Sequence, residues 1–147
     1  MGTPSPVCIM PALSRTTMFP ASLGQLNELR SFLEAFCAQA VIGRDGCLRL
    51  NLVLEELFTN TVRHGHRGDS EAPVWVNLGA GDDGRVTVSY EDTAPPFNPY
   101  ARPSPDTTQE IGKLAGRGVL LLQKLSADCE YAYVYGRNCI RLALNPN

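Results

Sequence analysis

The sequence predicts an α+β domain, a two-layer α/β sandwich in which a mostly antiparallel mixed sheet is covered on one face by about three helices. Three observations predict this class. Segments with alternating apolar residues come mainly in neighbouring pairs, as the strands of hairpins do. Other segments carry apolar residues at helical spacing. The length of 147 residues, with 44% hydrophobic and 19% charged residues, suits one domain and excludes a disordered chain.

The front of the chain predicts a strand followed by a helix. Residues 1–15 are expected to be a flexible lead-in to a single domain over 16–147, with a first strand near Thr16–Phe19. Ser22 is the candidate N-cap of a helix, which is expected to end near Val41 because glycines follow. The apolar residues of this helix are Leu23, Leu26, Leu29, Phe32, Leu33 and Phe36.

A second helix and two hairpins are predicted next. The helix runs from about Gly46 to Arg63, with an apolar stripe formed by Leu50, Val53, Leu54, Leu57 and Thr61. Alternation predicts four strands, Val74–Leu78, Val86–Tyr90, Glu130–Tyr135 and Cys139–Leu144. The second hairpin is expected to turn at Gly136-Arg137-Asn138. Between the hairpins, a segment rich in proline and glycine over 93–116 precedes a third predicted helix at about Val119–Ser126.

Charge, hydropathy and cysteine usage exclude several classes of protein. A net charge of −2 argues against direct nucleic-acid binding, which needs a basic excess. No apolar run approaches the ~20 residues of a membrane helix, so no membrane partner is expected. The five cysteines form no C-x-x-C pair, which predicts reduced thiols in a cytoplasmic protein and no zinc site.

Two polar residues of the second helix form a candidate metal site. Glu56 and Asn60 are four residues apart and therefore share one helix face. A carboxylate beside a carboxamide suits a hydrated Mg²⁺, which takes oxygen ligands and keeps several waters. Taken alone, such a pair is more often solvated surface.

A strand end supplies a second candidate. Asp92 ends a predicted strand, where its carboxylate can accept a hydrogen bond from an amino group of a base-like ligand, and Phe97 can pack under an aromatic ring. An aspartate that merely opens a turn is the alternative interpretation.

A glycine-rich helix entry supplies a third candidate. Gly116, Arg117 and Gly118 stand just before the third predicted helix, where backbone N–H groups can bind an anion. Lys113 and Arg117 add positive charge there. A plain glycine-rich helix entry is the alternative interpretation.

The order and spacing of these segments resemble the GHKL (Bergerat-fold) group of ATP-binding domains, and within it most nearly the RsbW-type anti-sigma-factor serine/threonine-protein kinases. The resemblance covers about Phe19 to Leu144. LEELFTNTVRHGH stands where the family has its N box, and EDTAPPFNP where it has its first glycine box. GRGVLLLQKLSADCEY matches the second glycine box with the strand after it, and GRNCIRLAL matches the closing strand.

The resemblance implies a Bergerat ATP-binding fold with ATP and Mg²⁺ as cofactors, and it implies roles for individual residues. Asn60 would hold Mg²⁺ and Glu56 would be the general base. Asp92 would read the adenine amino group. Gly116 and Gly118 would cradle phosphates.

The activity implied is that of an ATP-dependent serine-protein kinase and anti-sigma-type regulator of a bacterial partner switch. Its substrate would be a STAS-domain anti-anti-sigma protein, with a sigma factor as a further partner and an ATP lid at about 93–116. The alternative is a non-catalytic or weakly ATP-binding module that sequesters a sigma factor or another partner. Two departures from the family pattern favour that alternative: Ala94 replaces the glycine of D-x-G, and Asn98 replaces the aspartate after Phe97.

The first helix raises a separate question about assembly. In the resembled kinases this region is implicated in dimerisation or partner contact, so a homodimer is one interpretation of the face that includes Phe32, Leu33 and Phe36. The other is that this face covers the sheet, as most amphipathic helices do.

Overall fold

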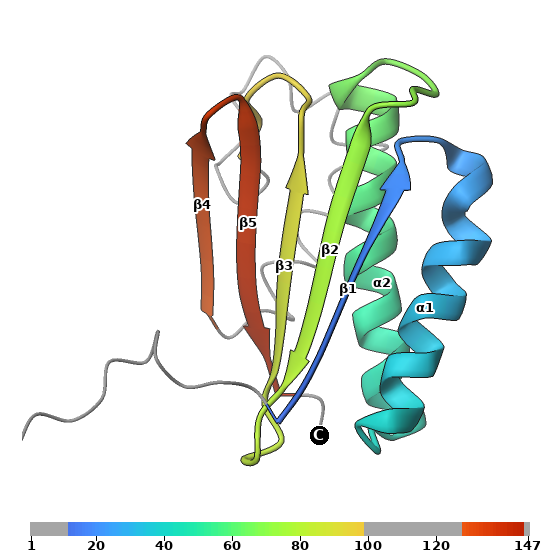
Figure 1. The fold of residues 1–147 in the computed structure, drawn as a ribbon, viewed down its shortest axis with the longest axis vertical. Coiled ribbons are helices and arrows are strands. Elements are labelled where there is room, and N and C mark those ends of the chain that lie inside the picture. Colours follow the sequence, from blue (N-terminus) through green and yellow to red (C-terminus); the bar gives the residue numbers. More distant parts are fainter. Residues whose placement is uncertain (1–11, 99–127, 146–147) are drawn as a thin grey trace, which may run out of the picture.

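The computed structural model describes residues 12–98 and 128–145. Within them, strands and helices form two layers (Figure 1). The elements in chain order are β1 (Leu13–Pro20), a 3₁₀ turn (Leu23–Gln25), α1 (Leu26–Gln39), α2 (Arg44–Asn60), a π-helical turn (Thr61–Gly65), β2 (Pro73–Ala80), β3 (Val86–Asp92), β4 (Asp128–Val134) and β5 (Arg137–Leu144).

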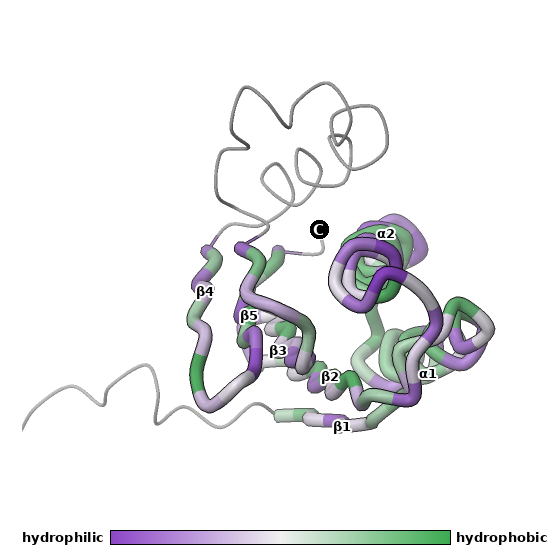
Figure 2. The backbone as a smooth tube through the Cα atoms, turned by 90° about the horizontal axis from the view of Figure 1, so that it is seen from above, coloured by the Kyte–Doolittle hydropathy of each residue, from purple (hydrophilic) through white to green (hydrophobic). Residues whose placement is uncertain are grey.

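The described strands form one sheet in the order β1-β2-β3-β5-β4, and every pairing between neighbours is antiparallel. Both described helices lie on the same face of this sheet, toward its β1–β2–β3 side (Figure 2). The predicted fold class is therefore confirmed. The third predicted helix, 119–126, lies outside the described residues, as does most of the segment 93–116.

The core lies between the helices and the sheet. Alternate residues of the central strands are buried, namely Val74, Val76 and Leu78 of β2, Val86, Val88 and Tyr90 of β3, and Ile140, Leu142 and Leu144 of β5. The predicted stripe of the second helix packs against them, with all five of its members buried. In the described part of the chain, neither α1 nor α2 is long and apolar enough to span a membrane.

The start of the helical layer differs from the prediction. The strand β1 begins at Leu13, inside the expected lead-in. Ser22 makes no side-chain capping bond, and the α-helix begins only at Leu26, after a 3₁₀ turn. The backbone N–H of Leu23 instead donates to Asp69 Oδ1 at 3.0 Å. This acceptor stands 46 residues away in sequence, which no local capping rule can detect.

The second hairpin turns earlier than predicted. Tyr135 and Gly136 both have positive φ, 51° and 76°, as a two-residue type I′ turn requires. The strand β5 therefore starts at Arg137, and Asn138 is a strand residue. In the sheet register, Asn138 lies directly opposite Asp92.

The burial of α2 predicts how two neighbouring leucines differ in their effect on stability. Leu54 is fully buried, whereas Leu52 is 40% exposed. Leu54→Ala is expected to lower the free energy of unfolding by about 3 kcal/mol, because it leaves a cavity under the helix. Leu52→Ala, the matched control, should cost less than about 1 kcal/mol. Urea unfolding measures both, and equal costs would contradict this placement of α2.

Candidate functional site

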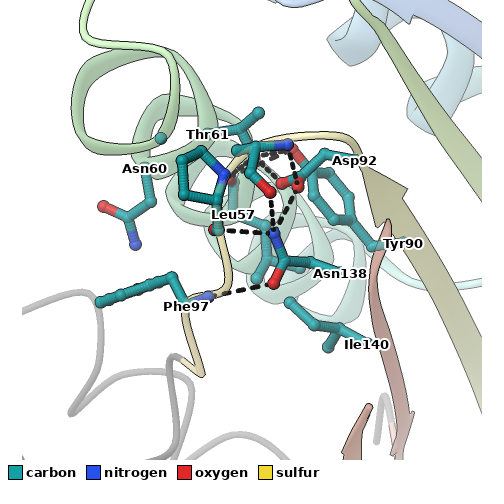
Figure 3. Close-up of a pocket in the computed structure, with 11 residues that line it drawn as sticks. Leu57, Asn60, Thr61, Tyr90, Asp92, Phe97, Asn138 and Ile140 are labelled. Atoms are coloured by element: carbon teal, nitrogen blue, oxygen red, sulfur yellow. Dashed lines mark hydrogen bonds between the residues drawn. The ribbon is translucent and has the colours of Figure 1, made fainter. Parts of the chain in front are cut away.

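A cluster of polar side chains lies where the end of α2 meets the end of β3 and the start of β5 (Figure 3). α2 brings Leu57 toward the sheet and the π-helical turn after it brings Thr61, while the alternation of β3 directs Tyr90 and Asp92 toward the helix. These residues line a cavity of about 20 Å³. That volume has room for about one water molecule.

The carboxylate of Asp92 is the centre of this cluster and is 5% exposed. Thr61 Oγ1–H donates to Oδ2 at 2.6 Å, while Oδ1 accepts from Ala94 N at 3.1 Å and from Asn138 Nδ2 at 2.8 Å. An ionised carboxylate offers about four lone pairs. These three bonds therefore saturate Oδ1 and leave one acceptor position on Oδ2.

A buried hydroxyl pair connects Asp92 to α2. Tyr90 Oη lies 2.7 Å from Thr61 Oγ1 and 3.2 Å from the carbonyl oxygen of Leu57. Because Thr61 has a single hydroxyl hydrogen, donating it to Asp92 leaves Tyr90 as the donor in this pair. Burial raises the pKa of Tyr90 well above its ordinary value, so the phenol keeps its proton.

Ala94, which replaces the glycine of the resembled family, fits the site because its neighbour is a glycine. Its methyl group is buried, and a Cβ placed on Gly65 would lie 2.6 Å from the Cβ of Ala94. The extra methyl at 94 is therefore accommodated by the missing one at 65. The alanine at position 94 therefore leaves the hydrogen bonds to Asp92 in place.

Asn60 and Glu56 lie one turn apart on α2, as predicted. Asn60 lines the cavity, and its buried Nδ2 has no hydrogen-bond partner among residues 12–98 and 128–145. Glu56 lies outside the cavity and is half-buried. Burial raises the pKa of the Glu56 carboxyl above 4.5, an effect that the positive charges of Arg63 and His64 oppose.

Phe97 lines the cavity and is 42% exposed. The side chains of Phe97 and Asn60 extend away from the hydrogen-bonded cluster (Figure 3). Lys113, Gly116, Arg117 and Gly118 lie outside the described residues, so their part in the site stays a prediction.

Three residues of the cluster have no predicted role: Thr61, Tyr90 and Asn138. Thr61 and Tyr90 belong to apolar patterns of a helix and a strand, and such patterns give no sign that their hydroxyl groups form hydrogen bonds in a site. Asn138 is predicted in a turn. A turn at Tyr135-Gly136 would place Asn138 in the strand and opposite Asp92. This alternative turn position is the signal in the sequence that could have identified Asn138.

Comparisons with known proteins identify a family and a shared fold. Residues 19–144 match the family model of the histidine kinase-like ATPase domain. Among solved structures, the chain is similar to the RsbU and RsbW domains of Rv1364c from Mycobacterium tuberculosis, with a TM-score of 0.64 and 16% identity over 92% of this chain and 33% of that one. A histidine kinase domain of the blue-light activated kinase of Erythrobacter litoralis has a TM-score of 0.48 and 18% identity, over 86% and 61%.

This chain therefore spans about a third of the length of the first of these structures. No match to a curated protein was found. At 16% identity, the likeness to the Mycobacterium tuberculosis structure shows a common fold. The family match reaches from β1 to the last residue of β5 and so covers most of the chain. The chain belongs to the family of histidine kinase-like ATPase domains.

Proposed function

We propose that this chain is a cytoplasmic, ATP-dependent serine-protein kinase and an anti-sigma-type regulator in a bacterial partner switch, with a STAS-domain anti-anti-sigma protein as its substrate. One observation carries the proposal: the buried carboxylate at the end of β3 keeps an acceptor position beside an unpartnered carboxamide on α2. The similarity in fold to a structure that contains an RsbW domain supports the choice of substrate class.

Asp92 would recognise the adenine base. Its Oδ2 can accept a hydrogen from the exocyclic amino group, the one donor that distinguishes adenine from an unsubstituted purine. The cavity of about 20 Å³ is too small for a base, so a side chain that lines it has to move aside. Phe97 is suited to this because its partly exposed ring can rotate while its backbone stays in place.

Asn60 would hold the metal and the phosphates. A carboxamide with a buried, unpartnered Nδ2 can donate to a phosphate oxygen, and its Oδ1 is an oxygen ligand of the kind that Mg²⁺ takes. Within 12–98 and 128–145, no group of three His, Cys, Asp or Glu side chains is placed to hold a metal ion, and an ion held mainly by phosphates and water needs none. When bound, Mg²⁺ neutralises charge on the transferred phosphoryl group.

Glu56 would act as the general base. Its carboxylate takes the hydroxyl proton of the substrate serine as that oxygen attacks the γ-phosphorus. The bond from the γ-phosphorus to its bridging oxygen breaks, and ADP leaves. A pKa raised by burial makes Glu56 a stronger base than an exposed glutamate.

The alternative, a module that sequesters its partner without catalysis, is favoured by the small size of the cavity. A phosphate-transfer assay distinguishes the two functions. Transfer of labelled phosphate from ATP to a co-encoded STAS protein supports the kinase, whereas tight partner binding without transfer supports sequestration.

Replacing the base-reading carboxylate tests nucleotide binding. Asp92→Asn is expected to weaken ADP binding by about 10- to 100-fold, because a hydrogen bond to a charged group contributes about 1.5–3 kcal/mol. Asp82→Asn, in the exposed turn between β2 and β3, is the control and should bind as the wild type does. Titration calorimetry measures both affinities. An unchanged affinity in Asp92→Asn would show that Asp92 does not bind the adenine base.

Replacing Glu56, the proposed general base, separates nucleotide binding from phosphoryl transfer. Glu56→Gln is expected to keep ADP binding and to slow phosphoryl transfer by about 100-fold or more, the usual scale for a lost general base. Its neighbour Glu55, which pairs with Arg30 at 2.7 Å, gives the control Glu55→Gln. Equal transfer rates in wild type and Glu56→Gln would exclude Glu56 from the reaction.

The raised pKa of Glu56 also predicts a change in stability with pH. A carboxyl whose pKa is higher in the folded state binds its proton more tightly there, so stability falls as pH rises above 4.5 through the folded value. Glu56→Gln removes this loss. Its melting temperature should exceed that of the wild type at pH 8, and the difference should vanish near pH ~4. A constant difference at all pH values would contradict the assignment.

A further inference from the structure

We propose that Asn138 is the positioning residue for the base-reading carboxylate. Its amide fixes Asp92 Oδ1 and the backbone of residues 94–97 in one arrangement, so that the remaining acceptor position on Asp92 Oδ2 faces the base. This inference rests on the proposed binding of ATP, and it explains how a chain with an alanine in its first glycine box keeps that carboxylate in place.

The amide nitrogen of Asn138 donates to three acceptors. Asn138 Nδ2 lies 2.8 Å from Asp92 Oδ1, 3.0 Å from the carbonyl oxygen of Ala94 and 3.1 Å from that of Pro95. Its two hydrogens are therefore shared between the carboxylate and the two peptide groups that follow it. One side chain thus connects the end of β3 to the chain just beyond it.

The amide oxygen of Asn138 accepts from two donors. Asn138 Oδ1 accepts from the backbone N–H of Phe97 at 3.0 Å and from the hydroxyl of Tyr131 on the edge strand β4. Because carbonyl oxygens and a carboxylate surround one end and N–H and O–H donors the other, only one orientation of the amide satisfies every partner.

This saturation assigns Asn138 a positioning role instead of a binding role. The side chain is 3% exposed, and both its hydrogens and both its oxygen lone pairs are used within the protein. No capacity is left for a ligand. Its effect on a nucleotide passes through Asp92, since losing the Nδ2 bond would leave Oδ1 held by the N–H of Ala94 alone and let the carboxylate turn.

An isosteric substitution tests this role. Asn138→Asp keeps the shape of the side chain but sets a carboxylate oxygen against Asp92 Oδ1 and two carbonyl oxygens. Two carboxylates that share a site cannot both ionise at low cost, so one takes up a proton as the pH falls. The protonated side chain regains an O–H donor toward Asp92. The defect should therefore be reversed by acid.

The experiment compares ADP with purine riboside 5′-diphosphate, which lacks only the 6-amino group, by titration calorimetry. The wild type is expected to prefer ADP by about tenfold or more. In Asn138→Asp at pH 8 this preference should fall to about twofold or less, while affinity for the analogue changes little, and at pH 5.5 the preference should return. Asn77→Asp is the matched control, since the described partners of Asn77 Nδ2 are groups of β1, at 2.7–3.3 Å, far from Asp92 in the sheet.

The outcomes distinguish the inference from the proposed function. A wild type that fails to bind ADP at millimolar concentration overturns both. A wild type that discriminates, with an Asn138→Asp variant that keeps the ratio or loses affinity for both ligands equally, overturns the positioning role alone. If Asn138→Asp does not fold at pH 8, Asn138→Ala supplies the comparison: it should lose the ratio at both pH values, and retaining it would overturn the inference.

Discussion

The site depends on the burial of one carboxylate. Asp92 forms no ion pair within the described residues, and its charge is balanced by three hydrogen bonds from neutral groups. Burying a charge without such bonds is costly. The donors come from the end of α2, from β5 and from the turn after β3, so the condition that stabilises the charge also fixes these three elements relative to one another.

The end of α2 and the π-helical turn that follows it place a structural and a chemical residue next to each other. Thr61 faces inward and donates to Asp92, whereas the amide nitrogen of Asn60, the preceding residue, has no hydrogen-bond partner in the described part of the chain. The π-helical turn begins here, and turns of this kind occur frequently at functional sites. The same turn ends at Gly65, whose missing Cβ makes room for Ala94. A departure at one position of the site is thus compensated at another.

Periodicity predicted the layers, the strands and the stripe of α2, because burial on one face of a regular element leaves a repeating pattern in sequence. The sequence also brought forward Glu56 and Asn60 by their spacing and Asp92 by its place at the end of a predicted strand. It could not find the roles of Thr61 and Asn138, because their partners are fixed by tertiary contacts. The shift of the hairpin turn to Tyr135-Gly136 changes Asn138 from a turn residue into the strand partner of Asp92. Likewise, Ser22 makes no capping bond, and the N–H of Leu23 at the start of the helical layer is bound by distant Asp69.

The polar groups of the site fall into two physical kinds. Thr61, Tyr90 and Asn138 are buried with their hydrogen bonds made, so a ligand gains nothing from them directly and they serve to hold Asp92. Asn60 Nδ2 has no hydrogen-bond partner among the described residues, and Glu56 has a pKa raised by burial. An unpartnered amide nitrogen and a carboxylate that is partly removed from water both cost stability in the free protein. A phosphate oxygen of a bound nucleotide would supply the missing acceptor for Asn60 Nδ2, and this would couple the stability of the domain to occupancy of the site.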